Sequence, residues 1–214
     1  QSNGRSFNWR FANQLKWDQT FNDVHYVSLL GQMSYQKQKY DFISASGENV
    51  AADGLYYVGS FNTNETGYGS FSDWKELGYL AVLNYSYDDK YIADLSFRYD
   101  GSSRFAADYR FGSFWSAGLA WNIDEEDFLA DSDIVNTLKL RVSLGEIGNN
   151  SVGLNAYQSL FGYGGSYDDN GAVSPSSFGN AILTWEKAAL YDIGIDFSIL
   201  DNRISGSIVA YNKK

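Results

Sequence analysis

The amino-acid sequence predicts an all-β protein, an antiparallel up-and-down meander of about eight strands that crosses a membrane as a β-barrel. Several segments alternate apolar and polar residues with a period of two, and their clearest apolar faces carry no charge. These segments reach about ten or more residues, which matches the ~9–11 residues that cross a bilayer at a tilt. The connections between them alternate between short turns and longer loops, as they do in outer-membrane barrels.

The composition narrows the class of protein. Aromatic residues make up 17% of the 214 residues, and there are 21 glycines, one proline and no cysteine. Such a composition is typical of β structure with glycine-rich turns and not of disorder. The absence of cysteine excludes disulfides, thiolate nucleophiles and cysteine-based metal sites. The formal net charge of −10, without a basic stripe, argues against nucleic acid as a partner.

The strands can be placed in order from the alternation. We expect them at residues 7–17, 24–44, 77–87, 91–100, 114–123, 137–146, 183–200 and 203–211. The expected connections are 19–23, 45–75, 88–90, 101–112, 124–136, 147–181 and 201–202. Residues 124–136 are too many for a minimal turn, and an acidic start at 124–127 favours one short helical turn there.

The polar faces of the predicted strands carry the charges. We expect these side chains to be lumen-facing, and pairing across strands or contact with a plug or water is favoured over a substrate path. They are Asp94, Arg98, Lys139, Arg141, Asp192 and Asp196. Tyrosines and tryptophans near the strand ends suit an interfacial aromatic girdle. They include Tyr85, Tyr87, Tyr91, Tyr99, Trp115, Trp121 and Trp185.

Alternation by itself leaves a second class open. A strand with one apolar and one polar face is also found in a soluble β-sandwich. A soluble carbohydrate-binding module of that fold is therefore an alternative, which predicts extraction without detergent. A small, independent eight-stranded outer-membrane barrel is a further structural alternative.

One hairpin carries motifs that resemble a known family. The run Asp100-Gly101-Ser102-Ser103-Arg104-Phe105, followed by residues 111–112 and 115–123, resembles the SusC/RagA family of TonB-linked outer-membrane transporters. Further blocks follow in the family's order at 125–128, 138–145, 148–149, 184–186, 192–197 and 202–207. The resemblance is stronger over 76–214 than over 1–75. Ala181, where a proline is expected, and Leu144, where an aromatic residue is common, depart from the pattern.

The resemblance implies that residues 1–214 are an internal segment of a larger transmembrane β-barrel, with the plug domain and the C-terminal strands outside this chain. It implies nutrient import across the bacterial outer membrane, of glycan fragments or similar substrates, oligosaccharide or peptide. The implied partners are outer-membrane lipid, a surface lipoprotein of the SusD kind and the TonB complex. It implies neither an enzyme nor a cofactor.

The candidate site residues are few. We find no catalytic constellation, and since His25 is the only histidine, a histidine-based metal cluster is excluded. Three aromatic residues expected in long loops, Trp74, Tyr163 and Tyr167, are candidates for stacking on a substrate, although packing within the loop is the favoured role for each. The resemblance leaves the physical role of residues 100–105 unassigned.

Overall fold

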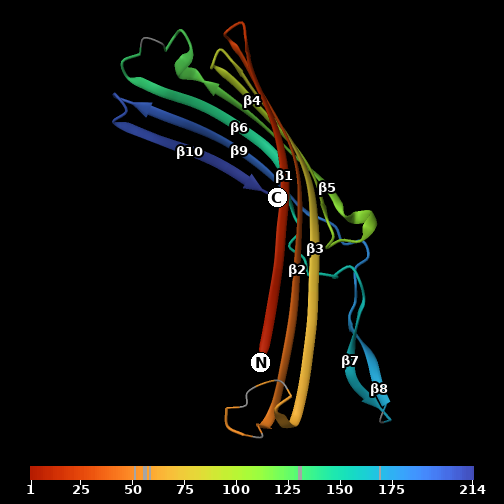
Figure 1. Cartoon of the computed structure of the whole chain (residues 1–214). Coiled ribbons are helices and arrows are strands. Elements are labelled where there is room, and N and C mark those ends of the chain that lie inside the picture. The colour runs from red at the N-terminus through yellow and green to blue at the C-terminus, as the bar shows by residue number, and fades with distance from the viewer. Residues whose placement is uncertain (51, 55–56, 58, 130–131, 169) are drawn as a thin grey trace.

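The computed structural model describes residues 1–50, 52–54, 57, 59–129, 132–168 and 170–214. It is an open sheet of eight strands in the order β1-β2-β3-β4-β5-β6-β9-β10, in which every neighbouring pair is antiparallel (Figure 1). The strands are β1 (Ser2–Phe21), β2 (His25–Val50), β3 (Phe61–Tyr87), β4 (Tyr91–Ser102), β5 (Phe111–Asn122), β6 (Val135–Asn149), β9 (Glu186–Ile199) and β10 (Ile204–Lys213). The predicted meander of eight strands is confirmed.

Two predicted loops are wrong because they contain strands. Residues 45–75 are not one long connection: β2 continues to Val50 and β3 begins at Phe61. This segment lacks regular apolar alternation, yet its backbone pairs residue by residue, and Ser46 bonds Thr66 through their hydroxyls at 2.7 Å. Residues 147–181 contain a separate hairpin of β7 (Leu160–Tyr167) and β8 (Asn170–Ser177).

The connections fall into two sets at opposite ends of the sheet (Figure 1). The turn at 88–90 uses Asp88 and Asp89 with φ of 53° and 52°, the left-handed conformation that a two-residue hairpin turn needs and that aspartate tolerates. The turns after β1 and β9 lie at the same end, as does the 3₁₀ turn η2 (Ile123–Glu125), which confirms the helical turn predicted after β5. The longer connections lie at the other end, where outer-membrane barrels have their extracellular loops.

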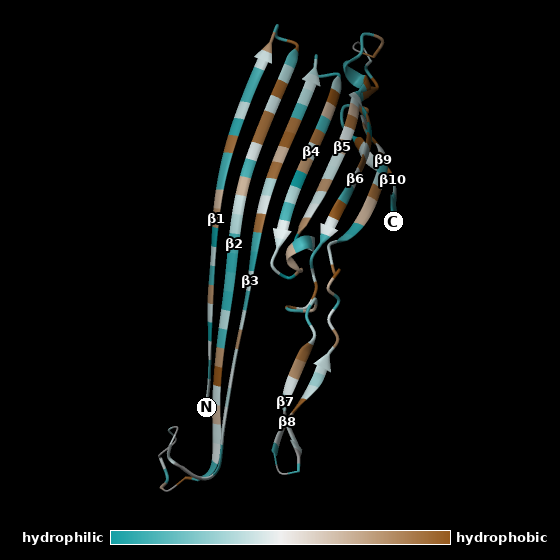
Figure 2. Ribbon diagram, turned by 90° about the vertical axis from the view of Figure 1, so that its right-hand side faces the viewer, coloured by the Kyte–Doolittle hydropathy of each residue, from teal (hydrophilic) through white to brown (hydrophobic). Residues whose placement is uncertain are grey.

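One face of the sheet is apolar along its whole width. Strand register aligns these residues into continuous cross-strand rows, of which one runs from Trp17 through Leu29, Leu83, Leu95 and Ala117 to Leu144. In Figure 2, hydrophobic positions in brown recur along the strands where all eight run side by side, and β1, β2 and β3 extend far beyond the others. We call this side the apolar face and the other side the polar face.

An aromatic row borders the apolar face at the short-turn end. It follows the register from Phe21 through His25, Tyr87 and Tyr91 to Trp121, so each ring lies beside the next across the strands. The ring centroids of Tyr87 and Tyr91 are 6.3 Å apart, and those of Tyr91 and Trp121 are 6.4 Å apart. The row has the form of an interfacial girdle.

A second aromatic row lies eight residues further along the strands. Tyr79 pairs with Tyr99, and the Tyr99 ring stacks on Phe111 at 5.0 Å. Eight residues at ~3.3 Å each span about 26 Å along a strand. A strand tilt of roughly 40° reduces this to about 20 Å, close to the ~25 Å apolar band of outer-membrane barrels. Trp115 does not join either row, because it pairs with Phe97 inside the band.

The two alternative architectures do not fit this sheet. Among the described residues, the only other sheet is the β7–β8 hairpin, and large side chains of the apolar face stay exposed, such as Leu15 at 78% and Leu119 at 61%. A sandwich would cover them. In the described part of the chain, no pairing joins β10 to β1, so these eight strands do not close into a barrel of their own.

Candidate functional site

The six charged residues expected on one side of the wall do share the polar face. Their positions alternate along each strand with the apolar rows, and they are Asp94 and Arg98 on β4, Lys139 and Arg141 on β6, and Asp192 and Asp196 on β9. Most of these six side chains form hydrogen bonds or ion pairs with residues of a neighbouring strand. The Asn84 amide, for example, donates to Asp94 Oδ1 at 2.5 Å across the β3–β4 pair.

Arg141 joins three strands through its guanidinium. Its Nε donates to Asp196 Oδ2 at 2.9 Å, and its Nη1 lies 3.8 Å from Asp192 Oδ1. Ser207 on β10 completes the network by donating to Asp196 Oδ1 at 2.6 Å. The guanidinium lies across Gly194, where a Cβ would come within 3.0 Å of Cζ. This geometry supports cross-strand pairing as the role of these charges.

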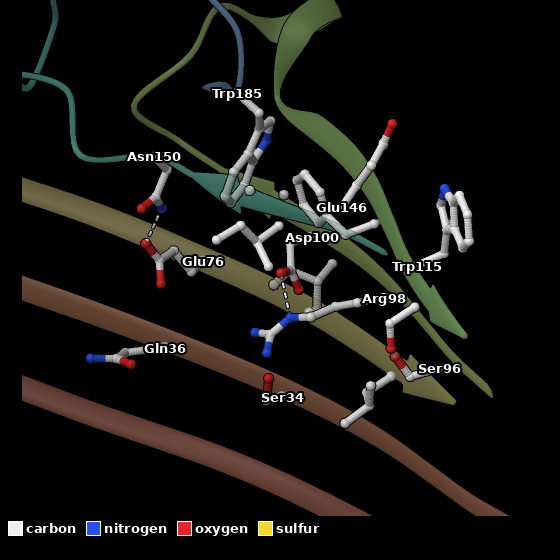
Figure 3. Close-up of a pocket in the computed structure, with 18 of the residues that line it drawn as sticks. Ser34, Gln36, Glu76, Ser96, Arg98, Asp100, Trp115, Glu146, Asn150 and Trp185 are labelled. Atoms are coloured by element: carbon white, nitrogen blue, oxygen red, sulfur yellow. Dashed lines mark hydrogen bonds and ion pairs between the residues drawn. The ribbon is translucent and has the colours of Figure 1, made fainter. Parts of the chain in front are cut away.

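The polar face contains a hollow of about 550 Å³ beside the ends of β4 and β5 (Figure 3). Its charged lining residues are Arg10, Glu76, Arg98, Asp100 and Glu146. Figure 3 shows Glu76 held by the Asn150 amide, which donates at 2.5 Å, and Arg98 paired with Asp100.

The charged residues that line the hollow come from four strands. Arg10 lies on β1, Glu76 on β3, Arg98 and Asp100 on β4, and Glu146 on β6, whereas the β2 and β5 residues of the lining are uncharged. Glu146 lies on the same side of β6 as Leu144 and pairs with Lys187 at 3.2 Å. The charges that meet in the hollow are therefore those of β1, β3 and β4, which the sheet register brings together.

Asp100 is the most enclosed carboxylate of the hollow. Its Oδ2 pairs with the Arg98 guanidinium, while its Oδ1 is buried and has no hydrogen-bond partner among the described residues. The Oδ1 lies against Gly78 on β3, where a Cβ would come within 2.6 Å of it. Any side chain at position 78 would therefore displace this carboxylate from its place against β3.

The family motif covers the last three residues of β4 and the first three of the loop after it, and it fastens neighbouring segments together. We call residues 100–105 the motif loop. Ser103 exchanges two bonds with Lys75 of β3: the Lys75 amide donates to Ser103 Oγ and the Ser103 amide donates to the Lys75 carbonyl, each at 2.9 Å. The Arg104 guanidinium donates to the Val152 carbonyl at 2.7 Å and lies over the Trp74 ring, 5.3 Å from its centroid.

Phe105 ends the motif loop inside a small aromatic core. Its side chain is 0% exposed, and its ring centroid lies 5.5 Å from that of Trp185. Phe114 of β5 is only 5% exposed, and its ring meets the Trp185 indole edge-on, with the ring centroids 5.3 Å apart. The indole Nε1 also donates to the Arg110 carbonyl at 2.8 Å. The aromatic core thus joins the motif loop to the segment before β9.

Two glycines make room for the aromatic core. A Cβ on Gly148 of β6 would come within 2.1 Å of the Phe114 ring, and one on Gly112 would meet both Phe114 and Trp185 within 3.0 Å. The prediction that Trp185 belongs to an interfacial girdle is wrong. Its ring packs on the polar face, because the bare backbone of Gly112 and Gly148 admits aromatic rings there.

The three candidate stacking residues are not brought together. Trp74 lies within β3 on the polar face, so its assignment to a loop is wrong. Tyr163 lies on the separate β7–β8 hairpin and is 88% exposed. Tyr167 ends β7, and its side chain lies outside the described part of the structure.

Sequence reasoning missed the aromatic core and the polar face of the long strands. Phe114 is an aromatic residue in an otherwise small or polar row, and that departure from the pattern was the available signal. Tyr40 and Phe42 lie within the strand predicted at 24–44, but Tyr68 lies in the part of β3 that was expected to be a loop. Their shared place on the polar face beyond the hollow was therefore not predicted.

The described residues offer contacts for a bound molecule, but no centre for covalent chemistry. Within the described ranges, no group of three or more His, Cys, Asp or Glu side chains is placed to hold a metal ion. No helix in that part of the chain is long and apolar enough to cross a membrane.

Comparison with known proteins gives one consistent result. Residues 1–214 match the family model described as "TonB dependent receptor-like, beta-barrel". The chain is 32% identical over 210 residues to TonB-dependent receptor P39 of Formosa agariphila, covering 97% of this chain and 20% of the relative. It is 37% identical over 145 residues to TonB-dependent receptor SusC of Bacteroides thetaiotaomicron, covering 64% of this chain and 14% of SusC.

The solved structures agree with the sequence relatives. The RagAB peptide transporter superposes on 99% of this chain with a TM-score of 0.92 and 26% sequence identity. The chain covers 24% of that transporter chain and 20% of receptor P39, so it spans about a fifth to a quarter of the proteins that it resembles.

Proposed function

Because this chain belongs to the TonB-dependent receptor-like β-barrel family, we propose that it forms part of the wall of an outer-membrane importer. TonB-dependent receptors are transporters of the bacterial outer membrane and not enzymes. The observation that carries the proposal is the family match over residues 1–214, on a sheet whose two faces differ in polarity. In this wall the apolar face contacts lipid and the polar face lines the lumen.

The remaining parts of the importer belong to a longer protein. Relatives are about four to five times the length of this chain, which supports further wall strands pairing with β1 and β10 and a plug domain within the lumen. A surface lipoprotein of the SusD kind covers the outer opening, and the TonB complex supplies energy from the periplasmic side. The charges on the polar face then pair across strands and contact plug or water.

The imported substrates are glycan fragments or similar nutrients, either oligosaccharide or peptide. The resemblance to the SusC/RagA family implies oligosaccharides, and the RagAB structure is described as a peptide transporter, so both kinds are kept. Import binds and releases substrate without changing its bonds, which suits a site built from noncovalent contacts.

The test is uptake by the native host. Deleting the gene for the full-length receptor is expected to abolish growth on the nutrient that induces it, while growth on glucose stays unchanged. Deleting the host's tonB gene is expected to leave cell-surface binding of that nutrient intact and to stop its import. Import that continues at the same rate without TonB would overturn the proposal.

A further inference from the structure

The apolar face of β1, β2 and β3 changes to a charged surface where these strands pass the end of β4 (Figure 2). The last apolar row and the three rows that follow it on the same face are Phe11–Tyr35–Leu77, Trp9–Lys37–Lys75, Phe7–Lys39–Asp73 and Arg5–Asp41–Phe71. We call the four cations of these rows, Lys37, Lys75, Lys39 and Arg5, the cationic rim. It lies at the end of the sheet that carries the longer connections.

The cationic rim is positive although the chain is acidic. The formal net charge of the chain is −10, yet the four cations of the rim share their rows with only two carboxylates, Asp41 and Asp73. Asp41 lies 3.9 Å from the amine of Lys39. Arg104 lies over the ring of Trp74 on the polar face, so it is not part of this surface. The rim therefore attracts an anion.

Lys37 and Lys75 form the centre of the rim. They lie directly opposite each other across the β2–β3 pair. Opposite residues of an antiparallel pair have Cβ atoms about 4.5–5.5 Å apart, and like charges at such positions destabilise the sheet. Neither amine has an ion pair in the part of the chain that the structure describes. An anion held between the two amines would remove this repulsion.

Aromatic neighbours place the two lysines at the level of lipid headgroups. Trp9 pairs with Lys37, and its ring centroid lies 5.1 Å from that of Tyr35. Tryptophan and tyrosine favour the boundary between hydrocarbon and headgroups. The lysine row lies two residues beyond Tyr35, about 7 Å along the strand. A headgroup layer is ~5–8 Å thick on each side of the hydrocarbon, so the amines lie within it.

This arrangement fits a phosphorylated lipid. Its phosphate accepts charge-assisted hydrogen bonds from both amines, while its acyl chains lie against Phe11 and the apolar rows nearer the middle of the sheet. Clusters of basic residues beside the hydrocarbon region attract anionic lipids in this way. A free phosphate would gain the same charges but would leave the adjoining apolar surface unused. An acidic protein would have to displace the surrounding headgroups to reach these rows.

We propose that the cationic rim binds the phosphate group of a lipid in the outer leaflet, with Lys37 and Lys75 as the two central contacts. The inference rests on the proposed function, because it requires the apolar face to contact lipid. The bound phosphate bridges β2 and β3 at the level where both strands leave the membrane. A lipid thereby stabilises the base of the long strands, whose upper parts lack neighbours from β4 to β10.

The test is lipid binding to the full-length receptor in detergent, measured by native mass spectrometry. The probes are monophosphoryl lipid A and the same lipid with its phosphate removed. Lys37→Gln/Lys75→Gln is expected to weaken binding of the phosphorylated probe about fivefold for each lysine and about thirtyfold together. Lys37→Arg/Lys75→Arg is expected to keep the affinity within about threefold, because both charges remain. Lys16→Gln/Lys139→Gln removes the same charge from the polar face and is the matched control with unchanged affinity.

Two comparisons on the wild-type receptor need no variant. Removing the phosphate from the lipid is expected to weaken binding about thirtyfold, since both amine contacts are lost. Excess inorganic phosphate is expected to leave the lipid bound, because free phosphate makes no contact with the apolar rows. Displacement of the lipid by inorganic phosphate would show a site for the free anion and would overturn the lipid site.

The remaining outcomes also decide the matter. Equal affinity for the two lipids, equal affinity of Lys37→Gln/Lys75→Gln and wild type, or an equal loss in the polar-face control would each overturn the cationic rim as a lipid site. The proposed function is judged separately by uptake. If the receptor shows no preference for the phosphorylated lipid but import still depends on TonB, the importer stands and the lipid site is wrong.

Discussion

At the scale of single residues, the motif loop gains a physical role. The Asp-Gly-Ser-Ser run resembles ordinary turn chemistry, but Phe105, at the end of the motif loop, is the most buried large side chain among the described residues. It lies beside a sheet whose other large apolar side chains are mostly exposed on one face. The aromatic core of Phe105, Phe114 and Trp185 is therefore the part of the wall that resembles a protein interior.

We expect Phe105→Ala to lower the free energy of unfolding by about 3–5 kcal/mol, the usual cost of removing a buried Phe side chain. The measurement is the urea midpoint of the full-length receptor, followed by the mobility of folded and unfolded protein on unheated SDS gels. Phe128→Ala is the control, because Phe128 is 69% exposed and its loss leaves no cavity. Equal midpoints for the two variants would contradict a packing role for Phe105.

At the scale of elements, the connection between β5 and β6 folds back onto the aromatic row. Glu126 Oε1 accepts hydrogen bonds from the Tyr91 hydroxyl at 2.6 Å and from the Trp121 indole at 2.9 Å. These two bonds, Tyr91 first, hold the pKa of the Glu126 carboxyl below its usual range. Lys90 nearby acts in the same direction, and Asp88 opposes it.

This lowered pKa predicts a pH dependence. A carboxyl whose pKa is lower in the folded than in the unfolded protein adds stability at neutral pH, and that contribution is lost as the pH falls through the folded value. Glu126→Gln is therefore expected to lower the unfolding midpoint at pH 7 and to have progressively less effect as the pH falls below the usual carboxyl range. Glu125→Gln, at an exposed position next to it, is the control. A difference between Glu126→Gln and wild type that is constant from pH 7 to pH 3 would contradict the role of the charged form.

At the scale of the whole molecule, the two faces of the sheet meet different surroundings. If the apolar face contacts lipid and the polar face lines the lumen, as we propose, the same substitution should differ in cost between neighbouring residues of a strand. Leu95 lies midway between the two aromatic rows, and Ser96 next to it points to the polar face.

Leu95→Arg is expected to destabilise the full-length receptor by about 2–4 kcal/mol, the cost of a cation at the bilayer midplane. Ser96→Arg, one residue along β4, is expected to cost far less because it enters the lumen near Asp94. The check is unfolding of both variants in lipid vesicles by urea. A larger cost for Ser96→Arg would reverse the assignment of the two faces.

The sequence predicted much of the wall but little of the surface beyond the membrane. Between the aromatic rows, lipid requires an apolar residue at every second position, and this constraint makes strands such as 91–100 readable from their pattern. Beyond the rows, both sides of a strand meet polar surroundings and the pattern disappears. The paired strands at 61–75 were therefore read as a loop, and Trp74 with them.

By itself, the sequence determined the class of fold, the order of the strands, the charges of the polar face and the resemblance to SusC/RagA transporters. Only the tertiary structure decided that Phe105 and Trp185 pack together, that Gly78 makes room for Asp100, and that Arg141 joins β6 to β9 and β10. The physical reason is that the alternation carries only local information. Alternation records the surroundings of each residue within its own strand, whereas a core or a binding surface depends on register between strands that are distant in the chain.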